Sequence, residues 1–367
     1  MTILPNYIGL SAFGIKMPVI FPGDNIIKMV YDSLEKCAED NLLTNDSIVC
    51  ITESVVAKSQ NNYVTLNDIS QDIKTKLNLE NNSTVGVFFP IASRNRFSSI
   101  LKGISRAVPM GKVCVQFPEK KDEVGNELIN HPATGMNYIE FYKEIIEQEG
   151  ATPFIIRSDS HKEIFYQNPK GIVVASIHSR NEDLQIIKKD FKNCLTLQEL
   201  CNEQQNAKGW SEWGLLGSNL SSNEKLKLAP RNSYEIVRQI QQKVKSGLEK
   251  DIEVMIYGDG AYKDPSTGIY ELADPVVAFG YTSKLENPRL GVKYKFLVDE
   301  GLNKKKTKRQ IAEIIKEESA KQHEIHSMSM EGTTPRALKD LAGTLADLVS
   351  GSADAGTPLV LIRGLLN

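Results

Sequence analysis

The sequence feature that most constrains the fold is a regular alternation of apolar runs and amphipathic stretches in the middle of the chain. The apolar runs lie at 85–89, 112–117, 153–157 and 171–177, and the amphipathic stretches lie near 94–107, 137–149, 160–167 and 181–192. Short apolar runs that alternate with helix-length stretches are typical of βαβ units around a parallel sheet. We therefore predict an α/β fold class, in which residues 84–205 form a parallel-sheet domain.

The segments on both sides of this middle region also predict mixed helices and strands. Helices are expected over 24–40, from Asn232 or Ser233, over 307–321 and from Pro335 to Gly351, and strands over 47–52, 252–257, 275–279 and 358–362. In the last helix the leucines at 338, 341, 345 and 348 form the expected buried stripe. With 367 residues the chain is long enough for two domains. We expect a core built from residues 1–83 and 206–367, with 84–205 inserted.

The charge balance and the cysteines limit the possible partners. The chain has 44 Lys+Arg and 46 Asp+Glu, a net charge of −2, which argues against a dedicated nucleic-acid binder and favours a small ligand. Its five cysteines form no C-x-x-C pair, so we expect buried free thiols in a reducing compartment. Pro and Gly residues interrupt the charge-poor segment 1–22, and no apolar run approaches the ~20 residues of a membrane span. We expect a cytoplasmic protein that does not bind membranes.

Two groups of residues have the components of an anion site. Arg94 and Arg96 lie at the start of the predicted helix near 94–107, where the helix dipole disfavours cations unless an anion is present. The alternative is that both arginines are solvated and pair with acidic neighbours. Thr333, Thr334 and Arg336 lie at the start of the last predicted helix, where the threonines cap the helix whether or not an anion binds.

The segment 257–274 concentrates acidic residues directly after a predicted buried strand. It contains Asp259, Asp264, Glu271 and Asp274. Hard cations such as Mg²⁺ bind a few carboxylates together with substrate phosphate, and polar groups often converge at strand ends. The alternative is a polar hairpin loop whose acids face water, and the spacing alone leaves both interpretations open.

Several segments together resemble the coenzyme F-420-0:L-glutamate ligase (gamma-glutamyl ligase) family. They are Thr-Glu-Ser-Val-Val-Ala-Lys at 52–58, Gly-Leu-Leu-Gly-Ser-Asn at 214–219, Tyr-Gly-Asp-Gly at 257–260 and Pro-Leu-Val-Leu-Ile-Arg-Gly at 358–364. The C-terminal match is the most specific, because a Leu-rich helix, a Ser-Gly-Ser turn and a Pro-hydrophobic-Arg-Gly strand follow in the same order. Residues 84–205 resemble the long insertion of a bacterial branch of that family, including Ser-Arg-Asn-Arg-Phe at 93–97.

The resemblance implies a ligase that uses GTP (or ATP) and Mg²⁺ or Mn²⁺. The nucleotide would phosphorylate the carboxylate of a small-molecule acceptor, and L-glutamate would attack the acyl phosphate through its α-amine. We expect Lys58, Arg94 and Arg96 to act in catalysis. Nucleotide phosphate is expected at Ser218, Asn219, Thr333, Thr334 and Arg336, and metal at Asp259, Asp264, Glu271 and Asp274. The resemblance also implies a homodimer, and the apolar segment 1–22 is the expected contact. The alternative is that residues 1–22 cover the sheet of their own monomer.

The chain differs from the typical family sequence at two places. The position of the family's metal-binding Asp is Leu216, and the family's Asp-Thr-Phe-Gly-Arg segment keeps its first Asp, Asp259, but loses the Thr and the arginines. Two alternatives therefore accompany the main hypothesis. One is a folate poly-gamma-glutamyl ligase of the same fold, and the other is a non-catalytic protein that binds a nucleotide or phosphorylated metabolite.

Overall fold

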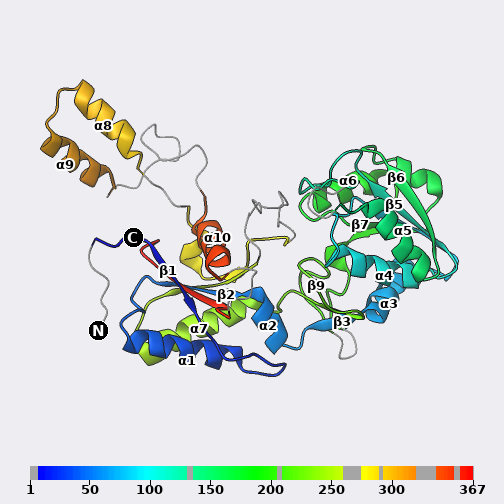
Figure 1. The fold of residues 1–367 in the computed structure, drawn as a ribbon, viewed down its shortest axis with the longest axis horizontal. Coiled ribbons are helices and arrows are strands. Elements are labelled where there is room, and N and C mark those ends of the chain that lie inside the picture. The colour runs from blue at the N-terminus through cyan, green and yellow to red at the C-terminus, as the bar shows by residue number, and fades with distance from the viewer. Residues whose placement is uncertain are drawn as a thin grey trace.

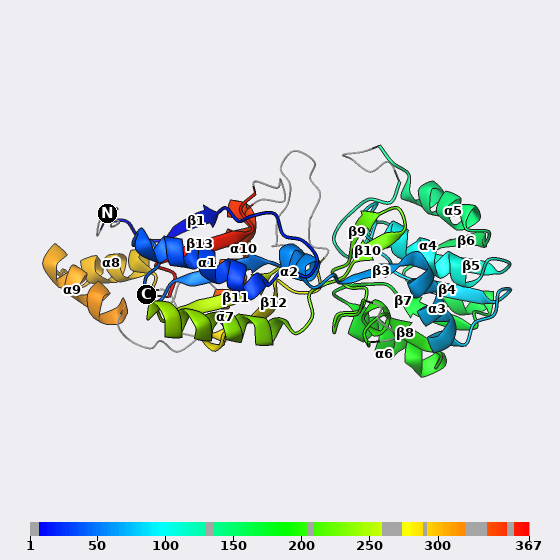
Figure 2. The ribbon, with the colours of Figure 1, turned by 90° about the horizontal axis from the view of Figure 1, so that it is seen from below.

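The computed structural model describes residues 7–129, 135–204, 209–258, 274–288, 292–319, 336–350 and 356–366. These residues form two lobes that lie side by side, with a thin junction between them (Figures 1 and 2). Each lobe contains a sheet covered by helices, and one of the two sheets is entirely parallel. The predicted α/β fold class is therefore confirmed.

The first lobe is a mixed sheet built from both ends of the chain. Its strands, in spatial order, are β1 (Ser11–Ile15), β13 (Leu359–Arg363), β2 (Ile48–Thr52), β11 (Glu253–Tyr257) and β12 (Ala278–Tyr281). Helices α1 (Ile26–Glu39) and α7 (Ser233–Leu248) cover one face, and α10 (Leu338–Ser350) covers the other. The two faces bury separate apolar clusters, so the lobe has three layers. We call this the core lobe.

The second lobe, which we call the insert lobe, contains the predicted parallel sheet. Its strands, in spatial order, are β6 (Thr152–Arg157), β5 (Lys112–Phe117), β4 (Thr84–Phe88), β7 (Gly171–Val174) and β8 (Cys194–Thr196). One face packs against α3 (Leu66–Leu77), α4 (Phe97–Ala107) and α5 (Tyr138–Gln148), and the other against η1 (Glu163–Gln167) and α6 (Arg180–Asp190). The chain starts at β4 in the middle of the sheet and winds outward in both directions, as in doubly wound α/β folds.

A small antiparallel sheet lies where the lobes meet (Figure 2). It contains β3 (Tyr63–Thr65), β10 (Lys225–Lys227) and β9 (Asn219–Ser222). The apolar cluster of the insert lobe includes Val64 and Leu228 on this sheet, and α3 packs so closely on α4 that a Cβ at Gly103 would lie 2.6 Å from Ile69 Cγ2. We therefore propose that the insert lobe begins at β3 and ends at β10, which is wider than 84–205.

Several helix boundaries differ from the sequence predictions. Helix α4 begins at Phe97, so Arg94 precedes it and Arg96 is its N-cap residue. The stretch near 160–167 forms a short 3₁₀ helix, and α10 begins only at Leu338. The predicted leucine stripe of α10 is wrong at Leu348, which is 58% exposed. Small residues face the sheet instead, namely Ala342, Gly343 and Ala346, because α10 lies too close for larger ones: a Cβ at Gly343 would lie 2.5 Å from Val277 Cγ1.

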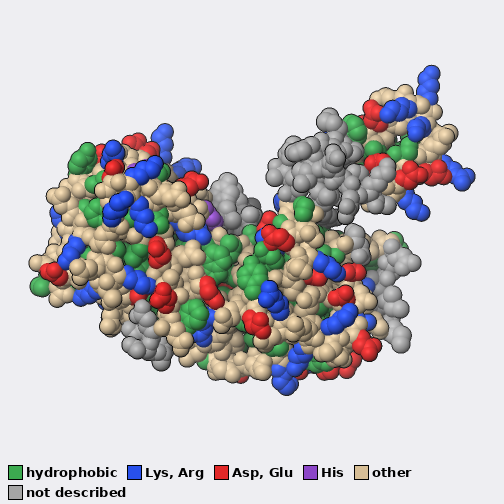
Figure 3. All heavy atoms as spheres, turned by 180° about the vertical axis from the view of Figure 1, so that it is seen from behind, with side chains coloured by type: hydrophobic (Ala, Val, Ile, Leu, Met, Phe, Trp, Pro, Cys, Tyr) green, Lys and Arg blue, Asp and Glu red, His purple; other side chains and the backbone are tan. Residues whose placement is uncertain are grey.

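The surface carries both signs of charge and an unusual projection. Helices α8 (Tyr294–Asn303) and α9 (Lys308–Ser319) form a hairpin that projects from the core lobe (Figure 1). Lys, Arg, Asp and Glu side chains are interspersed over the face in Figure 3. All five cysteines are free and buried, as predicted. No helix in the described ranges has the length and apolarity that crossing a membrane requires.

Candidate functional site

A cleft of about 610 Å³ opens at one edge of the core-lobe sheet, next to the junction with the insert lobe. Its volume lies within the usual range for small-molecule sites, roughly 300–1,000 Å³. Its walls come from residues 17–20, 52–55, 58, 219, 257–258, 347, 350 and 356–358. All four sequence segments that resemble the ligase family contribute to this wall, the segment 214–219 through Asn219.

The order of the strands explains why these distant segments meet. Strands β2 and β11 are parallel and end together, with Thr52 opposite Tyr257. Strand β13 runs antiparallel to β2, so its first residues reach the same edge, where the Thr52 N–H donates to the Pro358 carbonyl oxygen over 3.0 Å. Two strands therefore end where a third begins, and the turns around them form one wall.

Lys58 provides the cleft with a positive charge. It lies in the last turn of α2 (Glu53–Ser59), the helix that follows β2, and its side chain lines the cleft. Among the residues that the structure describes, no carboxylate lies within ion-pair distance of the Lys58 ammonium. A half-buried ammonium without a counter-ion can bind an anion such as a phosphate.

A buried ion pair holds the first turn of α2. Lys227 Nζ of β10 donates to Glu53 Oε1 over 3.1 Å and to Ser54 Oγ over 2.5 Å, and Thr52 Oγ1 donates to Glu53 Oε2 over 2.9 Å. Burial alone would raise the pKa of Glu53, but Lys227, Thr52 and the charge of Arg96 together lower it below the ordinary value. Glu53 therefore stays ionised, and Ser54, whose oxygen accepts from Lys227, keeps its own hydrogen for a ligand.

Two hydroxyl groups at or beside the cleft have no hydrogen-bond partner within the described part of the chain. They are Thr357 Oγ1 in the cleft wall and Ser218 Oγ, next to Asn219. A buried hydroxyl without a partner costs free energy, typically about 1–3 kcal/mol. Polar groups of this kind are available to a ligand that supplies the missing hydrogen bond.

The predicted metal and catalytic residues Asp274 and Arg96 form an ion pair across the two lobes. Arg96 Nη1 donates to Asp274 Oδ1 over 2.6 Å, and the two side chains are only 13% and 1% exposed. Asp274 Oδ2 lies against Gly258, where a Cβ would approach it to 2.5 Å. Asp274 is thus placed at the end of β11, beside the cleft residue Gly258. Asp259, Asp264 and Glu271 lie outside the described residues.

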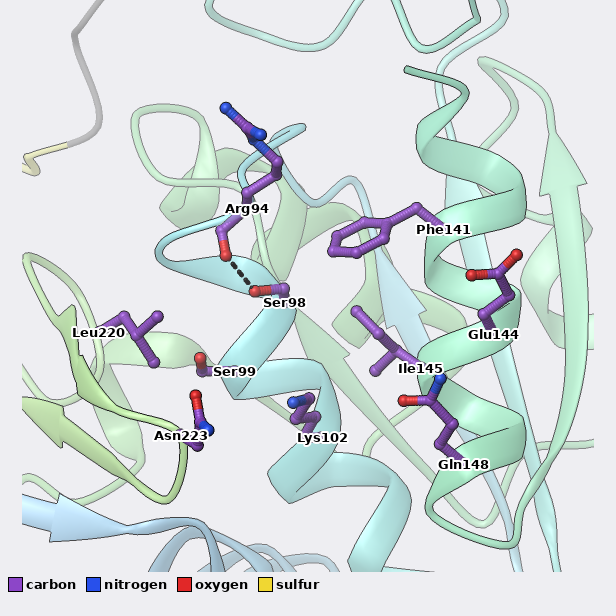
Figure 4. A pocket seen from close by; sticks show the side chains of 10 residues that line it. All are labelled: Arg94, Ser98, Ser99, Lys102, Phe141, Glu144, Ile145, Gln148, Leu220 and Asn223. Atoms are coloured by element: carbon purple, nitrogen blue, oxygen red, sulfur yellow. Dashed lines mark hydrogen bonds between the residues drawn. The ribbon is translucent and has the colours of Figure 1, made fainter. Parts of the chain in front are cut away.

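The remaining predicted site residues are spread over other regions. Arg94 lines a separate groove between α4 and α5 (Figure 4). Arg336 is exposed, precedes α10 rather than lying in its first turn, and is not among the residues that line the cleft. Thr333 and Thr334 lie outside the described residues. Leu216 is 1% exposed within the apolar cluster of the insert lobe.

Sequence reasoning missed several polar residues of the cleft. Glu53, Ser54 and Thr357 lie in or next to segments that resemble the family, so that signal was available. Tyr257 and Ser350, whose hydroxyl oxygens lie 2.5 Å apart at the cleft, also belong to segments that resemble the family. Lys227 had no comparable signal. Burial raises the pKa of Tyr257, so its hydroxyl stays protonated and acts as a hydrogen-bond donor or acceptor.

Comparisons with known proteins place these observations in context. The family model described as F420-0:Gamma-glutamyl ligase matches residues 14–364. No curated protein matches the chain. One matching solved structure is the tetrameric eIF2B-beta2-delta2 complex from C. thermophilum, with 8% sequence identity and a TM-score of 0.26. That alignment covers 50% of this chain and 54% of the other, so the chain spans about half the length of that relative.

Proposed function

We propose a specific reaction for this chain, which belongs to the F420-0:gamma-glutamyl ligase family, a family of amide-forming ligases. The chain joins the α-amine of L-glutamate to a carboxylate of an acceptor that resembles coenzyme F-420-0. A nucleotide of the GTP type, with ATP as the alternative, supplies the free energy. The reaction takes place in the cleft at the edge of the core-lobe sheet.

The proposed reaction has two steps. An acceptor carboxylate oxygen attacks the γ-phosphorus, the bond from that phosphorus to the bridging oxygen breaks, and the nucleoside diphosphate leaves. The glutamate amine then attacks the acyl carbon, the carbon–oxygen bond to phosphate breaks, and inorganic phosphate and a proton leave. Phosphoryl transfer of this kind depends mainly on positioning and charge stabilisation rather than on a protein nucleophile.

The residues of the cleft match these needs. The Lys58 ammonium binds the phosphoryl group that is transferred, and the hydroxyl groups of Ser54 and Thr357 donate to its oxygens. Asn219 reaches the cleft from β9 and orients the nucleotide phosphates, next to Ser218. Arg96 acts indirectly in this proposal, because it holds Asp274. Positive charges and hydrogen-bond donors that are already in position around a phosphoryl group are usually the main source of rate enhancement.

A divalent cation fits the end of β11. Gly258 has no side chain, which leaves room for the Asp274 carboxylate, and Asp259 follows it in the sequence. Carboxylate oxygens are the ligands that Mg²⁺ and Mn²⁺ prefer. Asp274 and Asp259 would hold the cation, with Asp264 or Glu271 as a further ligand. When bound, the cation neutralises phosphate charge. The described residues contain no group of three potential ligands.

The observation that carries this proposal is the Lys58 ammonium, which has no counter-ion among the described residues and lies in a cleft built from family segments. The test is phosphate release from GTP with candidate acceptors, in the presence and absence of L-glutamate. Phosphate that appears only with acceptor and glutamate together, with an amide product of the expected mass, supports the proposal. Binding of GTP without acceptor-dependent phosphate release contradicts it.

One observation favours a second candidate function. Leu216 stands where the family has a metal-binding Asp, and it is buried among apolar side chains. A non-catalytic protein that binds a nucleotide or a phosphorylated metabolite would tolerate this change. The same assay separates the two functions, and folates in the acceptor panel test the alternative of a folate poly-gamma-glutamyl ligase.

We also propose that the chain works as a cytoplasmic homodimer. Strand β1 is an edge strand, and large apolar side chains around it are exposed, namely Tyr7, Ile8, Leu10, Val19 and Phe21. Exposed apolar residues beside a free sheet edge favour pairing with a second copy. Light scattering at micromolar concentration should give a dimer mass, and Tyr7→Ser/Leu10→Ser should lower it. A monomer mass for the unmodified chain would contradict the dimer.

A further inference from the structure

The groove between α4 and α5 is a second cavity, distinct from the cleft. It has a volume of about 190 Å³ and also contacts the β9–β10 hairpin (Figure 4). Residues four apart on a helix share a face, so Ser98 and Lys102 of α4 form one wall, and Phe141 and Ile145 of α5 form the other. Leu220 of β9 completes the apolar part of the lining.

The groove combines an aromatic ring with a cation. Lys102 lines it, and within the described residues its ammonium forms no ion pair with a carboxylate. Arg94 also lines the groove, but its guanidinium points away from Lys102 in Figure 4. The ring of Phe141 is held in place by Tyr138 and Tyr142, with ring centroids 6.3 Å and 5.5 Å away. Glu144 also lines the groove, from α5, and its carboxylate points away from Lys102 in Figure 4. The α4 side is therefore positive and the centre apolar.

A buried hydroxyl adds an independent sign of a ligand. Ser99, in the first turn of α4, is 3% exposed and lines the groove. Its hydroxyl has no hydrogen-bond partner among the residues that the structure describes. This hydroxyl at the positive end of a helix and the Lys102 ammonium on the same helix together provide the donors that an oxyanion requires.

The groove and the cleft share a wall. Asn219 lines the cleft and the next residue, Leu220, lines the groove, because successive side chains of a strand point to opposite faces. The Leu220 N–H donates to the Asn95 carbonyl oxygen over 2.8 Å, which fixes β9 beside the loop that carries Arg94. A ligand held in the groove therefore lies beside the cleft, separated from it by a single strand and this loop.

We propose that this groove binds the acceptor of the ligase, through an oxyanion attached to a flat apolar ring. The oxyanion, a phosphate or a carboxylate, contacts Lys102 and Ser99, and the ring packs on Phe141. The acceptor carboxylate that reacts extends past β9 to the cleft. This inference rests on the proposed function, because it assigns a place to the acceptor.

Calorimetric titration of the full chain tests the groove with small aromatic probes. Phenyl phosphate and benzoate are titrated separately, with inorganic phosphate as the probe without a ring. We expect an aryl oxyanion to bind at least tenfold more tightly than inorganic phosphate. Lys102→Gln should weaken that binding at least tenfold. The matched control is Lys143→Gln on the same α5 helix, which pairs with Glu140 outside the groove and should leave affinity unchanged.

The two aryl probes distinguish the sources of the oxyanion, since preference for one of them identifies a phosphate ester or a carboxylate. Absence of binding by both, or equal affinity in wild type and Lys102→Gln, overturns the inference. Loss of probe binding when GTP saturates the protein also overturns it, because that result places the ring in the cleft. GTP titrated into the same protein reports on the cleft separately. Absence of GTP binding contradicts the proposed function instead.

Discussion

The two lobes both bring loops to the edge of a sheet, but they differ in how the polar groups there are satisfied. In the insert lobe, Glu123 accepts hydrogen bonds from the backbone N–H groups of Ile177, His178 and Ser179 at the start of α6. Asp122 accepts from the Ala92 N–H over 2.8 Å, after β4. The lobe's own carboxylates therefore occupy the anion-binding groups at the ends of β4 and β7.

At the equivalent edge of the core-lobe sheet, some polar groups have no partner among the described residues. Among the described residues Lys58 has no counter-ion and Thr357 Oγ1 has no hydrogen-bond partner. In doubly wound sheets, ligands usually bind at the carboxyl ends of strands where the winding reverses, which here lies between β4 and β7. The positions of the strand ends alone suggest one ligand site in each lobe. The polar groups without partners among the described residues favour the site in the core lobe.

The largest effect is expected at Lys58. Lys58→Met should lower turnover by about 10²–10³-fold, because in the proposed reaction it removes the charge that faces the phosphoryl group. Stability should change little, since within the described part of the chain the ammonium has no ion-pair partner to lose. Phosphate-release kinetics and thermal melting measure the two effects, with Lys36→Met on the exposed side of α1 as the control. Normal turnover in Lys58→Met would remove the main contrast between the lobes.

The ion pair between the lobes should show the next largest effect. Arg96→Ala removes the guanidinium that pairs with the buried carboxylate of Asp274, and breaking a buried ion pair typically costs about 3–5 kcal/mol of folding free energy. The double variant Arg96→Ala/Asp274→Asn should recover part of this loss, since it removes the uncompensated charge. Urea denaturation of wild type, Arg96→Ala, Asp274→Asn and the double variant gives the coupling energy of the pair. Additive losses in the double variant would show that the pair does not couple the lobes.

Acid should weaken the protein partly through Glu53. Because the folded state lowers the pKa of Glu53, its ion pair stabilises the fold above the ordinary carboxyl pKa, about 4.3, and this stability is lost as the pH falls through the lower folded value. Wild type should therefore lose stability more steeply than Glu53→Gln below about pH 4.3. Denaturation midpoints at several pH values measure the slopes. If the stability of wild type and Glu53→Gln fell in parallel with pH, Glu53 would not be a source of the acid sensitivity.

The smallest effect is expected at Glu123 of the insert lobe. Glu123→Gln keeps the shape but weakens the hydrogen bonds to residues 177–179, which should cost about 1 kcal/mol because the side chain is exposed. Turnover should stay within twofold of wild type, since Glu123 bonds within its own lobe and does not line the cleft. If the variant instead gained affinity for inorganic phosphate, the insert-lobe edge would be a second anion site that Glu123 blocks.

Much of the fold could be predicted from local patterns. The apolar runs at 85–89, 112–117 and 153–157 became β4, β5 and β6 with shifts of one residue or none. Strands β8, β9 and β10 were missed because they are only three or four residues long, too short for a periodic pattern. The last helix was found, but its buried face was wrong at Leu348, since the sheet approaches too closely for leucine.

For the candidate site, the sequence by itself determined the chemical types and the segments, such as Lys58 in 52–58 and the acids of 257–274. Only the tertiary structure decided which charges meet. Lys227 pairs with Glu53 from 174 residues away, and Arg96 with Asp274 from 178 residues away. The hydrophobic periodicity of a helix or strand indicates which of its faces is buried, whereas a salt bridge depends on how two elements are placed relative to each other. That approach is set by packing across the whole chain, and it leaves Lys58 without a counter-ion among the described residues.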